Sequence, residues 1–204
     1  MWHIPVSYAI FLRDVVQVPG FLNNGSNLFT PKLLMKASSS TVSDLENVRR
    51  DRRPLIVAGI VLGLGQGGFF DGIVFHQLLQ WHHMFTGIET DATVAGLELN
   101  TLGDGLFHAF DWLMTLIGIF LLWRAGKRAE VPWSGQTFVG SLLIGMGAFN
   151  LIEGIIDHHI LAIHHVKPGP HELAWDIGFL AAGALLAGIG WVLLQASRQA
   201  DTVA

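Results

Sequence analysis

The chain of 204 residues lacks cysteine altogether and contains few charged residues. The absence of cysteine excludes disulfides, iron–sulfur clusters and metal sites with thiolate ligands. Charged residues make up 14% of the chain, and the basic ones form no block large enough to indicate binding of nucleic acid. Hydrophobic residues make up 51% and the mean hydropathy is +0.47, which is typical of a membrane protein with several spans.

Motifs of common enzyme classes are also lacking. The sequence contains no nucleophilic serine motif, no phosphate-binding loop and no dinucleotide-binding fingerprint. Any chemistry must therefore come from other side chains.

Long apolar segments fill most of the chain after a polar beginning. They cover residues 54–84, 105–124, 137–166 and 172–196. Each is long enough to cross the hydrocarbon core of a bilayer, about 30 Å thick, and a span in lipid must be helical to satisfy its backbone. The predicted fold class is all-α, a polytopic membrane four-helix bundle over residues 54–197. A polar, mobile cytoplasmic segment over 1–53 precedes it, and a cytoplasmic tail over 198–204 follows.

Basic residues predict the orientation of the spans. Arginine and lysine gather before the first segment, between the second and third, and after the fourth, whereas the other two loops hold one lysine between them. Because basic loops stay in the cytoplasm, both termini are expected there. The expected location is the inner membrane of a bacterium.

Histidine is abundant, with ten residues in the chain. The stretch "EGIIDHHILAIHHV", at 153–166, holds four histidines and two carboxylates. In the expected orientation the first and third segments end outside and the second and fourth begin there, so nearly all ionisable side chains of the spans gather in the outer leaflet. Ionisable groups are rare inside membranes and indicate function.

The sequence also contains an internal repeat. "GLGQGGFFDGIVFHQLLQWHHM", at 63–84, aligns without a gap with "GMGAFNLIEGIIDHHILAIHHV", at 145–166, which pairs Asp71 with Glu153 and His76 with His158. The following segments match more loosely, and "HAFDW" over "LAWDI" places Asp111 on Asp176. We therefore expect two repeated helical hairpins related by an axis along the membrane normal.

On continuous helices the spacing predicts two polar faces. Eleven residues are about three turns, so Asp71 shares a face with His82, and Glu153 shares one with His164. Seven residues are about two turns, so His76 and His83 share a second face, as do their counterparts His158 and His165. Asp157 lies one turn from Glu153.

Imidazole and carboxylate together form the ligand set of zinc, iron, manganese or copper(II). So many groups near one depth exceed the needs of one ion and predict a site for two, in which Asp111 and Asp176 are the candidate catalytic residues, as a base or as partners of a ligating histidine. His159 and His171 are weaker candidates, because the first aligns with Gln77 and the second follows "KPGP". The candidate metal ligands are Asp71, His76, His82, His83, His108, Glu153, Asp157, His158, His164 and His165.

The motifs "GFFDGIVFHQLLQWHHM", "EGIIDHHILAIHH" and "HELAWD" resemble those of a family of bacterial four-helix predicted membrane proteins. The resemblance covers residues 54–197 and implies the fold and the membrane location, but no activity. Some members are joined to, or neighbour, the cytochrome oxidase assembly factor of the copper-insertion type, which implies respiratory oxidase assembly proteins as partners. The chain also has a weaker resemblance to membrane desaturases and hydroxylases. Those enzymes have four spans and bind two irons with histidine boxes.

Several functions fit these observations. The first is a membrane metalloenzyme, either an oxidoreductase or a hydrolase, whose metals activate oxygen or water. The second is a protein that holds copper or zinc for oxidase assembly, and the third is a b-type haem protein with axial histidines. A proton or ion pathway is disfavoured, because the inner half of every span lacks acids. We favour the enzyme; the sequence leaves open the identity of the metal, the substrate and the oligomeric state, a homo-oligomer included.

Overall fold

The structure is a computed structural model, which describes the backbone of residues 51–203 and the side chains up to residue 199. This part of the chain contains helices and no strand. Four helical segments are long and apolar enough to cross a membrane, which confirms the predicted all-α membrane fold. They are α3 (Arg53–Asp71) with η1 (Gly72–Leu78), α4 (Val94–Gly126), α5 (Gly135–Glu153) with η2 (Gly154–Ile160), and α6 (Glu172–Val203). The polar segment expected over 1–53 lies almost wholly outside the described residues.

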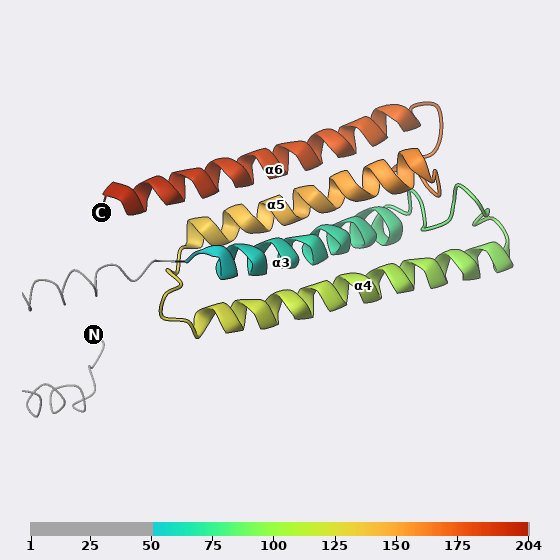
Figure 1. Cartoon of the computed structure of the whole chain (residues 1–204). Helices are drawn as coiled ribbons and strands as arrows, with labels where there is room; N and C mark the ends of the chain where they lie inside the picture. Colours follow the sequence, from blue (N-terminus) through green and yellow to red (C-terminus); the bar gives the residue numbers. More distant parts are fainter. Residues whose placement is uncertain (1–50, 204) are drawn as a thin grey trace, which may run out of the picture. The chain divides into compact units, whose positions relative to one another are not determined.

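The four helices lie side by side in a row (Figure 1). Helices α3 and α5 pack against each other in the middle, α4 packs on the outer side of α3, and α6 packs on the outer side of α5. Among the described residues, the backbones of α4 and α6 do not meet. Both inner helices run in the same direction, and η1 and η2 continue them at the same end of the row (Figure 1).

Glycine allows the two inner helices to approach closely. A Cβ atom added to Gly63 would lie 2.8 Å from the Cα of Gly145, and the reverse is also true. Such a Cβ would also overlap the backbone oxygen of Leu142, which cannot move aside. Small residues are the usual way for membrane helices to pack backbone against backbone, because dispersion contacts replace the hydrophobic effect there.

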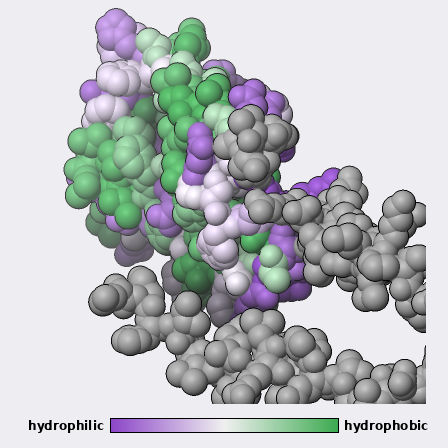
Figure 2. Space-filling view, turned by 90° about the vertical axis from the view of Figure 1, so that its left-hand side faces the viewer, coloured by the Kyte–Doolittle hydropathy of each residue, from purple (hydrophilic) through white to green (hydrophobic). Residues whose placement is uncertain are grey.

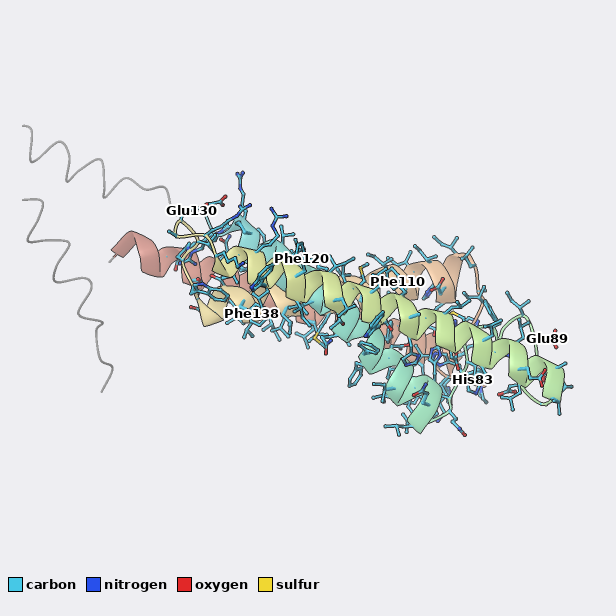
Figure 3. The ribbon with its side chains drawn as sticks, turned by 90° about the horizontal axis from the view of Figure 1, so that it is seen from below. His83, Glu89, Phe110, Phe120, Glu130 and Phe138 are labelled. Atoms are coloured by element: carbon cyan, nitrogen blue, oxygen red, sulfur yellow. The ribbon has the colours of Figure 1, made fainter. Side chains whose placement is uncertain are left out.

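The outward faces of the helices are apolar. On α4, Phe110 and Phe120 are about half exposed. They lie between the exposed acids Glu89 and Glu130, which are just beyond the two ends of this helix (Figure 3). Hydrophobic residues also cover much of the surface seen from the end that holds the α4–α5 loop (Figure 2). A protein surface of this kind is suited to lipid rather than water.

A network of side-chain hydrogen bonds connects three helices at the end where α3 begins. The guanidinium of Arg52 donates to the hydroxyl of Thr137 at 2.9 Å and also to that of Ser197. These two hydroxyls are buried and hydrogen-bond each other at 2.7 Å. This network lies far from the histidines, which are at the opposite end of α3.

Two of the predicted helix ends are wrong. The segments expected to run to residues 84 and 166 end at Leu78 and Ile160. Just beyond these ends, Gln80 and Ala162 have positive φ angles of 49° and 48°, which a right-handed helix cannot contain. Helix α4 in turn begins at Val94 and not near the expected residue 105, and the hydroxyl of Thr93 accepts from the amide of Gly96 at its start. The loop before it therefore covers 79–93.

Candidate metal centre

The π-helices bring one acid and one histidine together in each half. In an α-helix, side chains five residues apart point about 140° away from each other. The wider turn of a π-helix, with its i→i+5 hydrogen bonds, returns them to one side. His76 Nε2 therefore lies 3.2 Å from Asp71 Oδ2. In the second half, His158 Nε2 lies 3.6 Å from Glu153 Oε1.

His82 and His164 reach the same place from loops and not from helix faces. The prediction that they share a helical face with Asp71 and Glu153 is wrong, because the chain reverses at Gln80 and at Ala162. The reversal folds each loop back over the end of its own helix. Both rings are buried, with 1% exposure each.

The two loops hold each other by reciprocal hydrogen bonds. His82 Nδ1 donates to the carbonyl of Val166 at 2.8 Å, and His164 Nδ1 donates to the carbonyl of Met84 at 3.1 Å. The amide of Gly87 also donates to the carbonyl of Ile163 at 2.8 Å. Each half of the chain thus orients a histidine of the other half.

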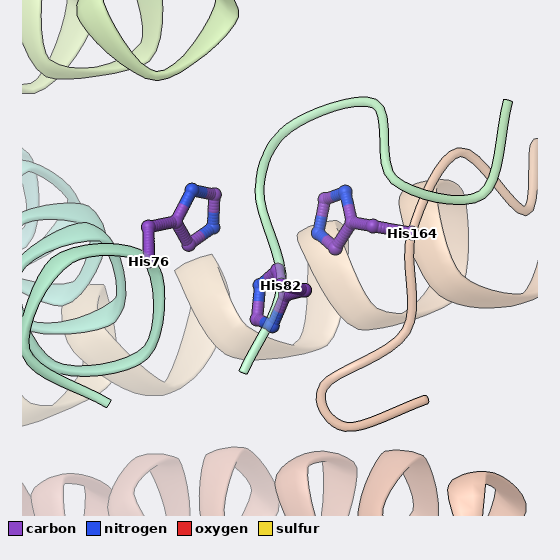
Figure 4. Close-up of side chains that lie close together, drawn as sticks. All are labelled: His76, His82 and His164. Atoms are coloured by element: carbon purple, nitrogen blue, oxygen red, sulfur yellow. The ribbon is translucent and has the colours of Figure 1, made fainter. Parts of the chain in front are cut away.

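Four imidazoles converge at the end of the bundle where η1 and η2 lie. The rings of His82 and His164 are stacked with their centroids 4.7 Å apart, and His76 and His158 lie at 4.4 Å from His82 and 4.9 Å from His164, respectively. Figure 4 shows three of the rings meeting between the helix ends and the loops. With Asp71 and Glu153 they form what we call the cage: Asp71, His76, His82, Glu153, His158 and His164.

The cage contains two overlapping sets of possible ligands. The ring nitrogens of His76, His82 and His164 lie within 4.8 Å of one another, and so do the ligand atoms of Glu153, His158 and His164. All these residues are buried. These sets bring together five candidate ligands of the sequence analysis, and Asp71, the sixth member of the cage, lies 3.2 Å from His76.

The hydrogen bonds leave lone pairs facing each other inside the cage. Because His164 Nδ1 carries the proton given to Met84, the neutral ring has only a lone pair at Nε2, which faces Glu153 Oε1 at 3.1 Å. His82 Nε2 is likewise buried and without a hydrogen-bond partner. Two acceptors at this distance repel each other unless a cation, a proton or a metal ion, lies between them.

His82 is suited to bind a metal because it is neutral. Burial, together with the neighbouring His76 and His164, lowers the pKa of His82 to about 2. At neutral pH its Nε2 lone pair is therefore free of a proton.

Two aspartates of the outer helices support the cage. Asp104 accepts from His76 Nδ1 at 2.7 Å, from His83 Nδ1 at 2.6 Å and from the amide of Met84 at 2.9 Å. A carboxylate on the far nitrogen of a ligating histidine fixes its tautomer and its direction.

Asp176 has the same place in the second half. It accepts from His165 Nδ1 at 2.7 Å and from the amide of Val166 at 3.0 Å, and its other contact is His158 Nδ1 at 3.6 Å. His83 and His165, expected as ligands, are thus partly buried partners of these aspartates and lie outside both ligand sets.

Sequence reasoning missed Asp104 and paired Asp176 with the wrong residue. The structural counterpart of Asp176 is Asp104 and not Asp111. The register that aligns Asp104 with Asp176 also aligns Gly118, which packs on Leu62, with Gly190, which packs on Ile144. An alignment of the second and fourth spans in this register would have found Asp104.

Three other candidates lie outside the cage. His108 packs over Gly72 and donates from Nδ1 to the carbonyl of Asp104 at 2.7 Å. Asp157 is only partly buried, and Phe75 aligns with it when 63–84 is aligned with 145–166. Asp111 is fully buried against Gly68, and neither of its carboxylate oxygens has a hydrogen-bond partner.

Comparison with known proteins identifies a family. The model of a family described as "Predicted membrane protein (DUF2243)" matches residues 58–197, which include the whole cage and both aspartates. No match was found among curated proteins or among solved structures. The family match confirms the resemblance seen in the sequence.

Proposed function

Since the chain belongs to this family of predicted membrane proteins, we propose that its buried histidines and acids form a two-metal centre of a membrane oxidoreductase. The observation that carries the proposal is the pair of lone pairs facing each other at 3.1 Å between His164 Nε2 and Glu153 Oε1. His164 and Glu153 would hold a metal ion as ligands, and its positive charge would remove this repulsion. Nitrogen and oxygen donors without sulfur suit iron, copper(II), manganese or zinc.

The charges of the site support two ions. Four buried acids, Asp71, Asp104, Glu153 and Asp176, surround the four imidazoles. No lysine or arginine is among the ionic partners of these acids in the described residues. Buried carboxylates without a compensating cation are costly in a membrane, and two divalent ions would supply four positive charges.

The symmetry of the cage also supports two metal ions. When 63–84 is aligned with 145–166 and Asp104 with Asp176, each half supplies an acid, two inward histidines and one orienting aspartate. We propose that the two hairpins are an internal repeat and that each half contributes one equivalent set of ligands, with His82 and His164 at the middle of the cage.

Burial favours electron transfer over hydrolysis or metal delivery. The six cage residues are between 0% and 6% exposed, so water has little access to them. Hydrolysis needs a water molecule at the metal, and a protein that hands over its metal needs ligands that a partner can reach. The convergence of four imidazoles and two carboxylates on one place also fits bare ions better than the axial pair of a haem.

The role of the protein side chains in this centre follows from their contacts. Asp104 and the carbonyls of Met84 and Val166 would hold the ring nitrogens in the tautomer that binds metal. When bound, iron or copper would supply the change of oxidation state. Asp111, buried on the side of the cage that faces the rest of α3, is positioned to exchange a proton as the charge of the centre changes.

We propose that the centre lies near the extracytoplasmic face. The cage lies where α3 ends, and Arg53, which begins α3, lies at the other end of that helix. Because arginine and lysine mark the cytoplasmic side, the cage belongs to the outer leaflet.

Elemental analysis and an absorption spectrum of the purified full chain test the proposal. About two iron or copper ions per chain, with a spectrum that changes on reduction, are expected. Zinc alone would contradict the oxidoreductase, since zinc has no redox chemistry. A Soret band would show haem, and full-chain protein without metal from metal-rich medium would contradict the centre itself.

A further inference from the structure

An aromatic cavity lies beside the cage and opens toward lipid. Its volume is about 350 Å³, within the range of small-molecule sites, about 300–1,000 Å³. Phe70 and Trp175 are 56% and 43% exposed, so the cavity reaches the surface of the spans. Its main lining residues are Phe70, Phe75, Trp81, Asn150, Trp175 and Phe179.

The lining presents aromatic faces and edges to the cavity. Phe75 and Trp81 are stacked, with ring centroids 5.4 Å apart and an angle of 22° between their planes. Trp175 lies 5.0 Å from Trp81, and Lys167 Nζ lies over both tryptophan rings at 4.6 Å and 5.4 Å. Flat rings of a ligand stack favourably on such side chains.

Asn150 supplies the one side-chain amide among the residues that line the cavity. An amide at this depth of a membrane is costly without a hydrogen-bond partner, and it can bind a carbonyl or hydroxyl group. The cavity therefore fits a molecule that is mostly apolar but carries an oxygen group.

Two lining residues also contact the cage. The ring of Phe75 lies 6.4 Å from that of His82, and the ring of Phe179 lies 5.3 Å from that of His158. A molecule in the cavity would thus be separated from the cage histidines by a single aromatic side chain.

The fold itself does not require this cavity. In the alignment of 63–84 with 145–166, the counterparts of Phe70, Phe75 and Trp81 are Ile152, Asp157 and Ile163. The aromatic lining therefore belongs to one side of an otherwise two-fold arrangement. This restriction to one side indicates a specific ligand.

We propose that this cavity binds a lipid-soluble quinone or quinol, whose ring packs against the aromatic side chains of the lining and whose oxygen is bound by Asn150. The inference rests on the proposed function, for which it names the class of membrane-dissolved substrate.

A quinone with a ten-carbon tail, added to the full chain in nanodiscs, is the probe. Saturable quenching of tryptophan fluorescence is expected in the unaltered protein. The quinone affinity should fall about tenfold or more in Gly178→Leu, since that glycine lines the cavity and a side chain there meets nothing within 4 Å. Ala182→Leu fills the same cavity and guards against a folding defect of the first variant, and Asn150→Leu should weaken binding as well.

Gly188→Leu is the matched control. It lies on the same helix, also faces open space and does not line the cavity, so it should bind the quinone normally. Quenching that does not saturate, or that is equal in all variants, would overturn the proposal. Equal competition by decanol, which has the tail but no ring, would assign the cavity to acyl chains and also overturn it.

Metal content measured on the same samples separates the two proposals. Protein that holds metal but does not bind the quinone would contradict only the cavity assignment. Protein that binds the quinone at this site without ever holding metal would contradict the metal centre and leave the cavity assignment standing.

Discussion

The imidazoles of His82 and His164 lie parallel, with an angle of 7° between their planes and 4.7 Å between their centroids. Each is oriented by a backbone carbonyl of the other half of the chain, that of Val166 or that of Met84. Both rings come from loops. The centre of the cage thus lies where the two loops that follow η1 and η2 meet.

Replacing His82 and His164 together by alanine should abolish metal binding, because both ligand sets of the cage contain His164 and one contains His82. Metal per chain, measured by elemental analysis, checks this. His159→Gln is the control, since His159 is exposed and its counterpart in the repeat is Gln77. A double variant that retains the normal metal content would contradict the cage as the site.

Asp104→Asn should weaken metal binding about 10- to 100-fold, because Asp104 orients the cage histidine His76. Asp176→Asn should weaken it less, because Asp176 lies 3.6 Å from the cage histidine His158. Asp111→Asn should leave metal binding unchanged, because Asp111 belongs to neither ligand set. Competition with a chelator gives the three affinities. If Asp111→Asn were the most damaging and Asp104→Asn harmless, the structural pairing of Asp104 with Asp176 would be wrong.

Gly63→Ala should destabilise the folded protein by about 1–3 kcal/mol, because the added methyl group would meet the backbone of α5. Gly105→Ala on α4 is the control, since nothing lies within 4 Å of its added Cβ and alanine is the better helix former. Thermal unfolding in one detergent compares the two variants. Equal midpoints would argue against the close packing of α3 and α5.

A reporter fused at residue 90 should prove extracytoplasmic, and one fused at residue 130 should prove cytoplasmic. The reason is the number of basic residues, which include Arg124, Lys127 and Arg128 next to the second position and none in the loop 79–93. Alkaline phosphatase and green fluorescent protein fusions report the two sides. A cytoplasmic residue 90 would reverse the topology and place the cage at the inner face.

Much of the fold could be predicted from the sequence, because long apolar segments leave the backbone little choice in lipid. The approximate depth of His76 and His158 followed from the same segments. The ends of the helices could not be predicted in this way. The stretch "FHQLLQWHH" has neither glycine nor proline at Gln80, where the chain turns. The wider turn of η1, which aligns Asp71 with His76, also has no signal in the spacing of apolar residues.

Asp104 shows a second limit. It lies in "LNTLGDGLF", which looked like a loop because glycine and polar residues surround it. The structure continues α4 through this stretch, with Asn100 fully buried and bonded to the carbonyls of Glu89 and Gly96. Tertiary hydrogen bonds to the loop stabilise a helix that local composition did not predict.

The reciprocal bonds between the two loops bear on ancestry. A chain with a single hairpin would contain one acid, two inward histidines and one aspartate. The carbonyl that orients its loop histidine would have to come from another copy of the chain. An ancestor of that size would have completed its site only as a symmetric dimer. Fusion of two such genes would have made that dimer permanent and freed each half to diverge, as the presence of Phe75 in one half and Asp157 at the equivalent position of the other illustrates.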